Sequence, residues 1–202
     1  MKVNEFIVLE QFIVSRYTMA ILPYFLNSDV YAKVIEEDGE YIIKQTPMDI
    51  IKHSCDYYGS SFQGRKEGTK AVIGITHKAP IAIEPANEIY VFPTASPRDS
   101  RCVWLSHMHV YRYEPAKYER TIVYFRNGKS ISLDVSCKSF INQLYRTAQL
   151  RTKLSERMEA RERKLQYIFR MQQEKKELAE QIDKNGFSDE FKLGVRTCKI
   201  KI

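Results

Sequence analysis

The chain has 202 residues, with 32 Lys and Arg against 25 Asp and Glu, and therefore a formal net charge of +7. No apolar run approaches the roughly 20 residues of a transmembrane helix, and the N-terminus lacks the pattern of a signal peptide. The four cysteines stand far apart without a CxxC pair. We therefore expect a reduced, cytoplasmic protein without a membrane partner, and the basic balance favours a polyanionic one.

Short apolar and β-branched runs predict strands in the first quarter of the chain. The runs at residues 11–15 and 18–22 indicate a first pair of strands. The runs at residues 30–36 and 40–44 flank an acidic, glycine-containing turn, which is a hairpin signal.

A helix is predicted from Pro47 to Tyr58. Thr46 can cap its first turn, proline suits that turn, and Gly59 suits the exit. Its buried face is expected to hold Met48, Ile51, Cys55 and Tyr58, which recur at helical spacing.

The glycine-rich segment at residues 59–69 predicts an exposed loop with Arg65 and Lys66 at its tip. Asn127-Gly128 is the strongest hairpin signal in the chain. The remaining strand-like runs lie at residues 71–77, 81–83, 89–92, 102–110, 120–125 and 130–135.

One uninterrupted helical pattern from Phe140 to Ile182 carries two separate stripes. Ser136 or Ser139 can cap this helix. The apolar stripe loses phase after Phe169, so we predict a bend or break near Met171. The apolar stripe consists of Phe140, Leu144, Leu154, Met158, Leu165 and Phe169, and the basic row of Arg146, Lys153, Arg157 and Lys164.

Positive charge is concentrated on this helix. Between Lys138 and Lys164, eight Lys or Arg oppose three Glu, a local charge of +5. This concentration indicates a polyanionic partner. The alternative is a solvated helix face, because Glu156, Glu159 and Glu162 are interleaved with the cations and allow weak surface pairs.

Together these elements predict an α+β fold, with a mostly antiparallel sheet region, an embedded helix and a long C-terminal helix. We expect a β-rich core with one helix over residues 1–136 and a long basic amphipathic helix over residues 137–184. The tail at residues 185–202 is short and mixed in composition, and we assign it no structure.

The sequence offers little support for an enzyme or a metal site. His107 and His109 lie two apart on one predicted strand with Cys102 nearby, yet they lack the paired spacing of a zinc motif. On a helix, His53 and Cys55 point in different directions, which favours a buried thiol over a nucleophile. Because no P-loop, GxSxG, HExxH or kinase motif occurs either, we predict no enzymatic activity, no metal and no cofactor.

A series of motifs runs in order through the chain from about Ser54 to Lys153. They are Ser54-Cys55, Tyr57-Tyr58-Gly59-Ser60-Ser61, Gly64-Arg65-Lys66, Gly68-Thr69, Thr76-His77-Lys78-Ala79-Pro80, Phe92-Pro93-Thr94, Trp104-Leu105-Ser106-His107-Met108-His109-Val110, Asn127-Gly128-Lys129, Tyr145-Arg146-Thr147-Ala148 and Leu150-Arg151-Thr152-Lys153. This series resembles the competence transcription factors of Gram-positive bacteria, the ComK family. The resemblance covers about half of the chain.

The resemblance implies a DNA-binding transcription activator that switches on genes for DNA uptake and its own gene. It implies recognition of paired A-rich and T-rich boxes through the minor groove, assembly into dimers or larger homo-oligomers, and RNA polymerase as a partner. Members of the family are held down by adaptor-directed proteolysis. The proline-containing adaptor-binding stretch of the family is not recognisable after Lys153, so the sequence leaves open whether a protease adaptor is a partner.

The candidate DNA-binding residues combine this resemblance with the charge pattern. A helix about 10 Å wide cannot enter a minor groove about 6 Å wide, whereas an arginine side chain can. Arg65 on the predicted loop is therefore the candidate reader of the minor groove, with Lys66 beside it. The other candidates are Lys78 and, for phosphate contacts from the long helix, Arg146, Arg151, Lys153 and Arg157.

Two other functions stay open at this point. In the first, the apolar stripe of the long helix mediates coiled-coil assembly, and the basic surface is incidental. In the second, a metal-dependent nuclease would need a metal at His107 and His109 together with carboxylates that the sequence does not identify. Salt-sensitive binding to AT-rich duplex DNA would distinguish DNA recognition from assembly.

Overall fold

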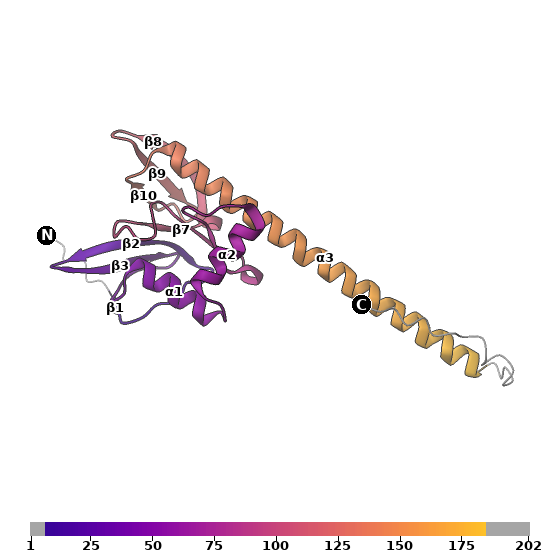
Figure 1. The fold of residues 1–202 in the computed structure, drawn as a ribbon. Coiled ribbons are helices and arrows are strands. Elements are labelled where there is room, and N and C mark those ends of the chain that lie inside the picture. The colour runs from indigo at the N-terminus through magenta and orange to yellow at the C-terminus, as the bar shows by residue number, and fades with distance from the viewer. Residues whose placement is uncertain (1–6, 185–202) are drawn as a thin grey trace. The chain divides into compact units, whose positions relative to one another are not determined.

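The computed structural model describes residues 7–184. The chain divides into two compact units, the first ending at Glu156 and the second beginning at Arg157. Within the described residues, the first unit contains a seven-stranded and a three-stranded sheet together with helical segments. These contents confirm the predicted α+β fold (Figure 1).

The larger sheet is mostly antiparallel, as predicted. Its strands are β1 (Ile7–Leu9), β2 (Thr18–Leu26), β3 (Asp29–Glu36), β4 (Glu40–Ile43), β5 (Ile81–Glu84), β6 (Ile89–Pro93) and β7 (Trp104–Ser106). They lie in the order β1-β4-β3-β2-β7-β6-β5. The pair β1 and β4 is parallel, and the other neighbouring pairs are antiparallel. The predicted hairpin of β3 and β4 is confirmed, with Val34 paired to Tyr41.

The smaller sheet is antiparallel and consists of β8 (Val110–Ala116), β9 (Arg120–Phe125) and β10 (Ser130–Leu133). The hairpin predicted at Asn127-Gly128 joins β9 to β10. Gly128 has a φ of 84°, a conformation that glycine adopts without strain.

Helix α1 (Pro47–Tyr57) forms where the sequence predicts it. The Thr46 side chain accepts a hydrogen bond of 3.2 Å from the backbone N–H of Asp49, and Pro47 begins the helix. Ile51 and Cys55 are fully buried, as expected, whereas Met48 and Tyr58 only pack against the edge of the core.

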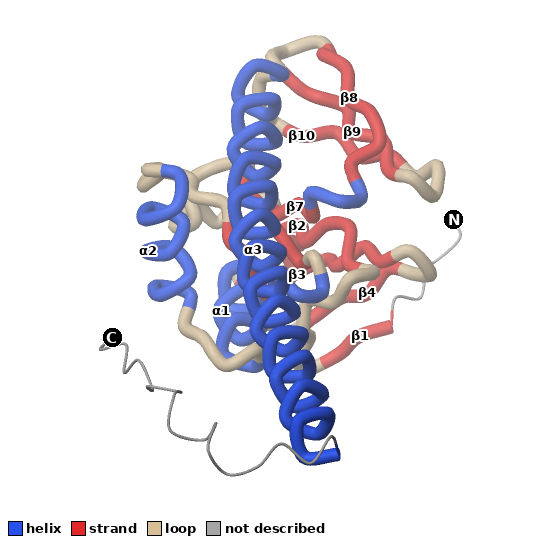
Figure 2. The backbone as a smooth tube through the Cα atoms, turned by 90° about the vertical axis from the view of Figure 1, so that its right-hand side faces the viewer, coloured by secondary structure: helices blue, strands red, loops and turns tan. Residues whose placement is uncertain are grey.

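Alternation of side chains along the strands creates apolar cores on the two faces of the larger sheet. On one face, Ile81 and Ile83 of β5 share a core with Ile50 of α1. On the other face, Phe92 of β6 packs against Phe140 in the first turn of the long C-terminal helix, with 5.8 Å between ring centroids. The smaller sheet and the first turns of that helix therefore cover the second face (Figure 2).

The loop predicted at residues 59–69 is wrong, because most of this segment belongs to helix α2 (Phe62–Ile73). The Ser61 side chain accepts a hydrogen bond of 3.0 Å from the N–H of Gly64, and Gly74, at a φ of 74°, ends the helix. The strand predicted at residues 71–77 is wrong as well, because α2 continues to Ile73 and residues 74–77 form no strand. Val72 and Ile73 pack against a small core that contains Tyr90 and Leu150. Tertiary packing and a good cap outweigh the glycines inside the helix.

Two further strand predictions need correction. Residues 11–15 form no strand, and β1 lies earlier in the chain. Val14 is nevertheless buried, and its N–H donates a hydrogen bond of 2.9 Å to the Ser54 hydroxyl, which satisfies the backbone without a strand partner. The predicted strand at residues 102–110 is interrupted by the 3-10 turn η2 (His107–His109). A second short turn, η1 (Pro85–Asn87), joins β5 to β6.

Helix α3 runs from Cys137 to Lys184. Ser136 caps it, since its hydroxyl accepts a hydrogen bond of 3.3 Å from the N–H of Ser139. Of the predicted bend or break near Met171, the break is wrong, because helical structure continues through that residue. No proline or glycine occurs within α3, so a change of phase in the apolar stripe does not interrupt its hydrogen bonds. The tail at residues 185–202 lies outside the described residues. Among the described helices, none is long and apolar enough to span a membrane.

Candidate nucleic-acid interface

A concave surface in the first unit gathers basic side chains from four separate segments. Its volume is about 820 Å³. It is lined by the first turns of α1 and α2, by residues 76–79 after α2, and by residues 96–98 between β6 and β7. We call it the basic cleft, and its polar and charged lining is Thr46, Asp49, Lys52, Gln63, Lys66, Thr76, His77, Lys78, Ser96 and Arg98.

The cleft is positively charged because its cations outnumber its carboxylates. Lys52 lies 3.7 Å from Asp49, which partly neutralises it. Within the part of the chain that the structure describes, no carboxylate lies at ion-pair distance from Lys66, Lys78 or Arg98. Such a concave, unneutralised surface attracts a polyanion.

Buried hydrogen bonds hold the segment that carries Lys78 against α3. The side-chain amide of Gln143, 2% exposed, donates to the carbonyl oxygens of Lys78 at 2.7 Å and Pro93 at 2.9 Å. Its oxygen accepts a hydrogen bond of 3.1 Å from the guanidinium of Arg146. Gln143 therefore links two of the residues predicted from the sequence, Lys78 and Arg146, and Lys66 lines the same cleft as Lys78.

Arg65 lies differently from the expectation of a flexible loop tip. It belongs to α2, and its Nε atom is buried without a hydrogen-bond partner among the described residues. The charge of Arg65 affects the pKa of two buried side chains, Cys55 and Tyr90. Burial raises the pKa of Cys55 to about 11, with Arg65 acting in the opposite direction, and burial likewise raises the pKa of Tyr90, which Arg65 also opposes.

Arg151 lies on another flank of α3. Five residues separate it from Arg146, which at 3.6 residues per turn places the two about 140° apart around the helix. Its guanidinium pairs with Glu88 at 2.6 Å, and it lines a shallow pocket with His107. Burial, and then the charge of Arg151, lower the pKa of His107. The candidate residues thus divide between two flanks of the helix.

The remaining two candidates lie further along α3. Lys153 follows Arg146 by seven residues, so it returns to the same side of the helix, and it is exposed. Arg157 begins the second unit and is also exposed.

Sequence reasoning missed Lys52 and Arg98 as members of the cleft, and it named His77 only as part of a family motif. Lys52 lies on the exposed side of α1, and Arg98 follows Pro97 in an ordinary polar loop. Neither has a local sequence signal, because only the tertiary structure brings the two segments to the same surface.

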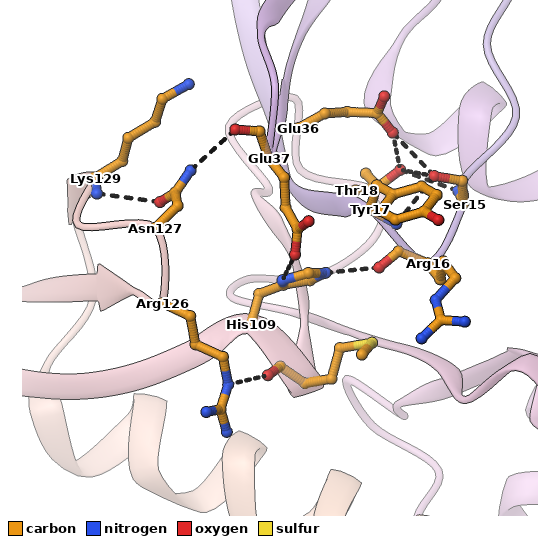
Figure 3. A network of polar contacts seen from close by, with 11 residues as sticks. Ser15, Arg16, Tyr17, Thr18, Glu36, Glu37, His109, Arg126, Asn127 and Lys129 are labelled. Carbon is orange, nitrogen blue, oxygen red and sulfur yellow. Dashed lines mark hydrogen bonds and ion pairs between the residues drawn. The ribbon is translucent and has the colours of Figure 1, made fainter.

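The histidines considered as metal ligands have other surroundings. His109 is 2% exposed, its Nε2 lies 2.7 Å from the carbonyl oxygen of Arg16, and its Nδ1 lies 3.4 Å from the Glu37 carboxylate (Figure 3). The Asn127 amide donates to the Glu37 carbonyl at 3.4 Å. This network joins the turn of the smaller sheet to the β3–β4 turn, and no group of three His, Cys, Asp or Glu suited to a metal occurs in the described residues.

The buried cysteines do not resemble nucleophiles. Burial raises the pKa of Cys55 and of Cys102 to about 11. Both thiols therefore stay protonated near neutral pH, where a thiol is a poor nucleophile.

Comparison with known proteins adds the decisive observation. The chain matches the ComK protein family over residues 9–159, which include every residue of the basic cleft. It belongs to the ComK family. A relative from Bacillus subtilis (strain 168), named competence transcription factor, is 42% identical over 153 residues, which cover 76% of this chain and 80% of the relative. No solved structure matches the chain significantly.

This membership confirms the resemblance to the ComK family. It also confirms the prediction that the protein is not an enzyme, because the family is one of transcription factors.

Proposed function

We propose that the protein is a DNA-binding transcription activator of genes for DNA uptake, which recognises paired AT-rich boxes largely through the minor groove. Family membership supports a competence transcription regulator. The observation that carries DNA binding is the basic cleft, where Lys66, Lys78 and Arg98 share one concave surface without carboxylate partners among the described residues.

The charge of the cleft supports phosphate contacts. Duplex DNA carries one negative charge per roughly 1.7 Å of its axis, and lysines that neutralise phosphates release counterions. The buried Gln143 amide hydrogen-bonds to the Lys78 carbonyl and to the Arg146 guanidinium. Phosphate contacts made from the cleft and from α3 would therefore be positioned relative to each other by one side chain. Phosphate contacts of this kind position a protein on DNA but do not read its sequence.

Sequence preference would come from the minor groove. A·T and G·C pairs differ there, whereas A·T and T·A look alike, so a minor-groove reader distinguishes AT-rich from GC-rich DNA and measures the spacing of its boxes. Paired boxes are matched most simply by two copies of the chain related by a twofold axis. The resulting complex would act on RNA polymerase.

The proposal is tested by titrating the purified protein with an AT-box duplex and a GC-substituted duplex of equal length in a gel-shift assay. We expect tighter binding to the AT-box duplex, loss of affinity with rising salt, and competition by a minor-groove ligand. Equal binding to both duplexes, or block of binding by major-groove modification alone, would reject minor-groove recognition.

Exposed apolar residues favour a second candidate function, helix-mediated assembly. Leu165 is 57% exposed and Phe169 is 62% exposed in the second unit. If assembly were the whole function, the protein would oligomerise through this stripe but bind neither duplex in a salt-sensitive way.

A further inference from the structure

Reading a narrow minor groove places strict demands on a protein side chain. The groove is about 6 Å wide, so the reader must be a slender side chain on an exposed turn or arm. Narrow A-tract grooves concentrate negative potential, and arginine responds best because its guanidinium is weakly hydrated and always charged. The arginine must also lack a carboxylate partner that would compete with the DNA.

Arg65 does not meet these demands. It lies on α2, a helix too wide for the minor groove, and its Nε atom is buried. Moving its guanidinium into DNA would require the side chain to withdraw this buried Nε atom from its present surroundings.

Arg98 meets each of them. It is exposed, it follows Pro97 in the loop between β6 and β7, and it lines the basic cleft. The neighbouring carboxylate of Asp99 is already engaged by Arg101, whose guanidinium donates to both carboxylate oxygens at 3.2 Å. These hydrogen bonds hold the pKa of Asp99 below its usual value. Arg101 thus neutralises the carboxylate that directly follows Arg98 in the chain.

The loop that carries Arg98 is braced from within. The N–H of Asp99 donates to the Ser96 carbonyl at 2.8 Å, and the N–H of Cys102 donates to the Asp99 carbonyl at 2.9 Å. Pro97 restricts its own backbone φ. A braced turn loses little conformational entropy on binding, so an arginine at its surface is prepared for insertion.

The surroundings of Arg98 suit the edges of a minor groove. Lys66 and Lys78 line the same cleft, and both lack carboxylate partners in the described structure. Cations beside an inserted arginine can contact the phosphates that border the groove. One surface of the cleft therefore carries a candidate contact to the bases in the groove and candidate contacts to the DNA phosphates.

We infer that Arg98 is the side chain that enters the AT-rich minor groove, while Lys66 and Lys78 contact the flanking phosphates. This inference rests on the proposed function of minor-groove recognition. It replaces Arg65 as the specificity-determining residue and makes the β6–β7 loop the reading element.

The test compares wild type with Arg98→Ala, Arg98→Lys and Arg65→Ala. Arg126→Ala is the matched control, because it removes an exposed arginine from a turn outside the cleft. Each protein is checked for wild-type thermal unfolding and titrated on AT-box and GC-substituted duplexes at several salt concentrations. Arg98→Ala is expected to weaken AT-box binding roughly tenfold or more and GC binding much less. Arg98→Lys should also lose part of the preference, and Arg126→Ala should keep all of it.

The possible outcomes separate the two proposals. A wild-type protein that binds both duplexes equally would overturn the proposed function itself. If wild type prefers the AT-box duplex, the inference is overturned when Arg98→Ala keeps the same preference as wild type. It is also overturned when Arg98→Ala loses equal affinity for both duplexes, which would make Arg98 a phosphate contact. Loss of the preference in Arg65→Ala but not in Arg98→Ala would identify Arg65 as the reader instead.

Discussion

At the scale of single residues, the surroundings of a cation decide what it can offer to DNA. Arg151 and Lys78 were equivalent candidates in the sequence, yet Arg151 pairs with Glu88 at 2.6 Å and Lys78 has no carboxylate partner in the described residues. A paired arginine must give up its partner before it binds a phosphate. Lys78 donates a hydrogen bond of 3.4 Å to the Thr94 carbonyl but has no ion pair among the described residues to give up, so its phosphate contact is less costly.

We therefore predict different salt dependences for two variants. Lys78→Ala should lower the slope of the logarithm of affinity against the logarithm of salt concentration by about one, on AT-box and GC duplexes alike. Arg151→Ala should change this slope less, because its charge is already matched by Glu88. Gel-shift titrations between low and moderate salt measure both slopes, and a larger change for Arg151→Ala would contradict the prediction.

The buried thiols predict how stability responds to alkaline pH. Burial raises the pKa of Cys55 and Cys102 from 9.0 to about 11. The folded protein keeps these protons where the unfolded chain releases them, so the contribution to stability is complete below about pH 9 and is lost as pH rises towards 11. Urea unfolding at a series of pH values should show this fall. A variant with Cys55→Ala and Cys102→Ala should show a smaller one; an equal fall would mean that the thiols do not contribute.

At the scale of elements, α2 is the segment where the structure departs most from the sequence-based prediction. Gly68 lies in the interior of this helix with open space where a Cβ atom would stand, whereas Gly74 ends the helix at a φ of 74°. The two glycines therefore have opposite roles. Gly68 only weakens the helix, whereas Gly74 allows the last turn of the helix to close.

Alanine substitutions distinguish these roles. Gly68→Ala should raise the free energy of unfolding by about 0.5–1 kcal/mol, because alanine loses less backbone entropy in a helix. Gly74→Ala should lower it by about 1 kcal/mol, because alanine is strained in the left-handed region. Denaturant unfolding measures both values. Destabilisation by Gly68→Ala would instead support a loop at this position.

The first turns of α3 stabilise the cleft through Gln143. Replacing its amide by an apolar side chain of similar length, Gln143→Leu, leaves the Lys78 and Pro93 carbonyls without their buried donor. We expect a loss of about 1–3 kcal/mol in the free energy of unfolding. DNA affinity should also fall, because Lys78 and Arg146 lose their common partner. Gln149→Leu is the control, since Gln149 is exposed on the same helix; equal losses in both variants would exclude a special role for Gln143.

At the scale of the whole molecule, the proposed recognition of paired boxes is matched most simply by two copies of the chain. We predict that the protein is at least a dimer, free or on a duplex with two boxes one helical turn apart. Sedimentation velocity measures its mass in both states. Leu165→Glu with Phe169→Glu should weaken self-association if the exposed stripe forms the contact. A monomer in both states would contradict the prediction.

The sequence by itself determined the features that depend on neighbouring residues. The Thr46 cap and Pro47 begin α1, Gly128 closes the β9–β10 hairpin, and the absence of helix-breaking residues lets α3 run without interruption. Hydrogen bonds over a few residues and side-chain periodicity act within a segment, so the segment itself contains the information.

Only the tertiary structure decided which distant residues share a surface. Packing of Val72 and Ile73 stabilises α2 despite its glycines, and burial of Gln143 holds the segment of Lys78 against α3. The motifs pointed to Lys66, Lys78 and Arg146, but not to Arg98. The place of Arg98 in the cleft depends on the packing of α1, α2 and the larger sheet, and the Asp99 carboxylate beside it is engaged by Arg101. The physical reason is that burial and charge neutralisation act between segments far apart in the chain, where no local pattern records them.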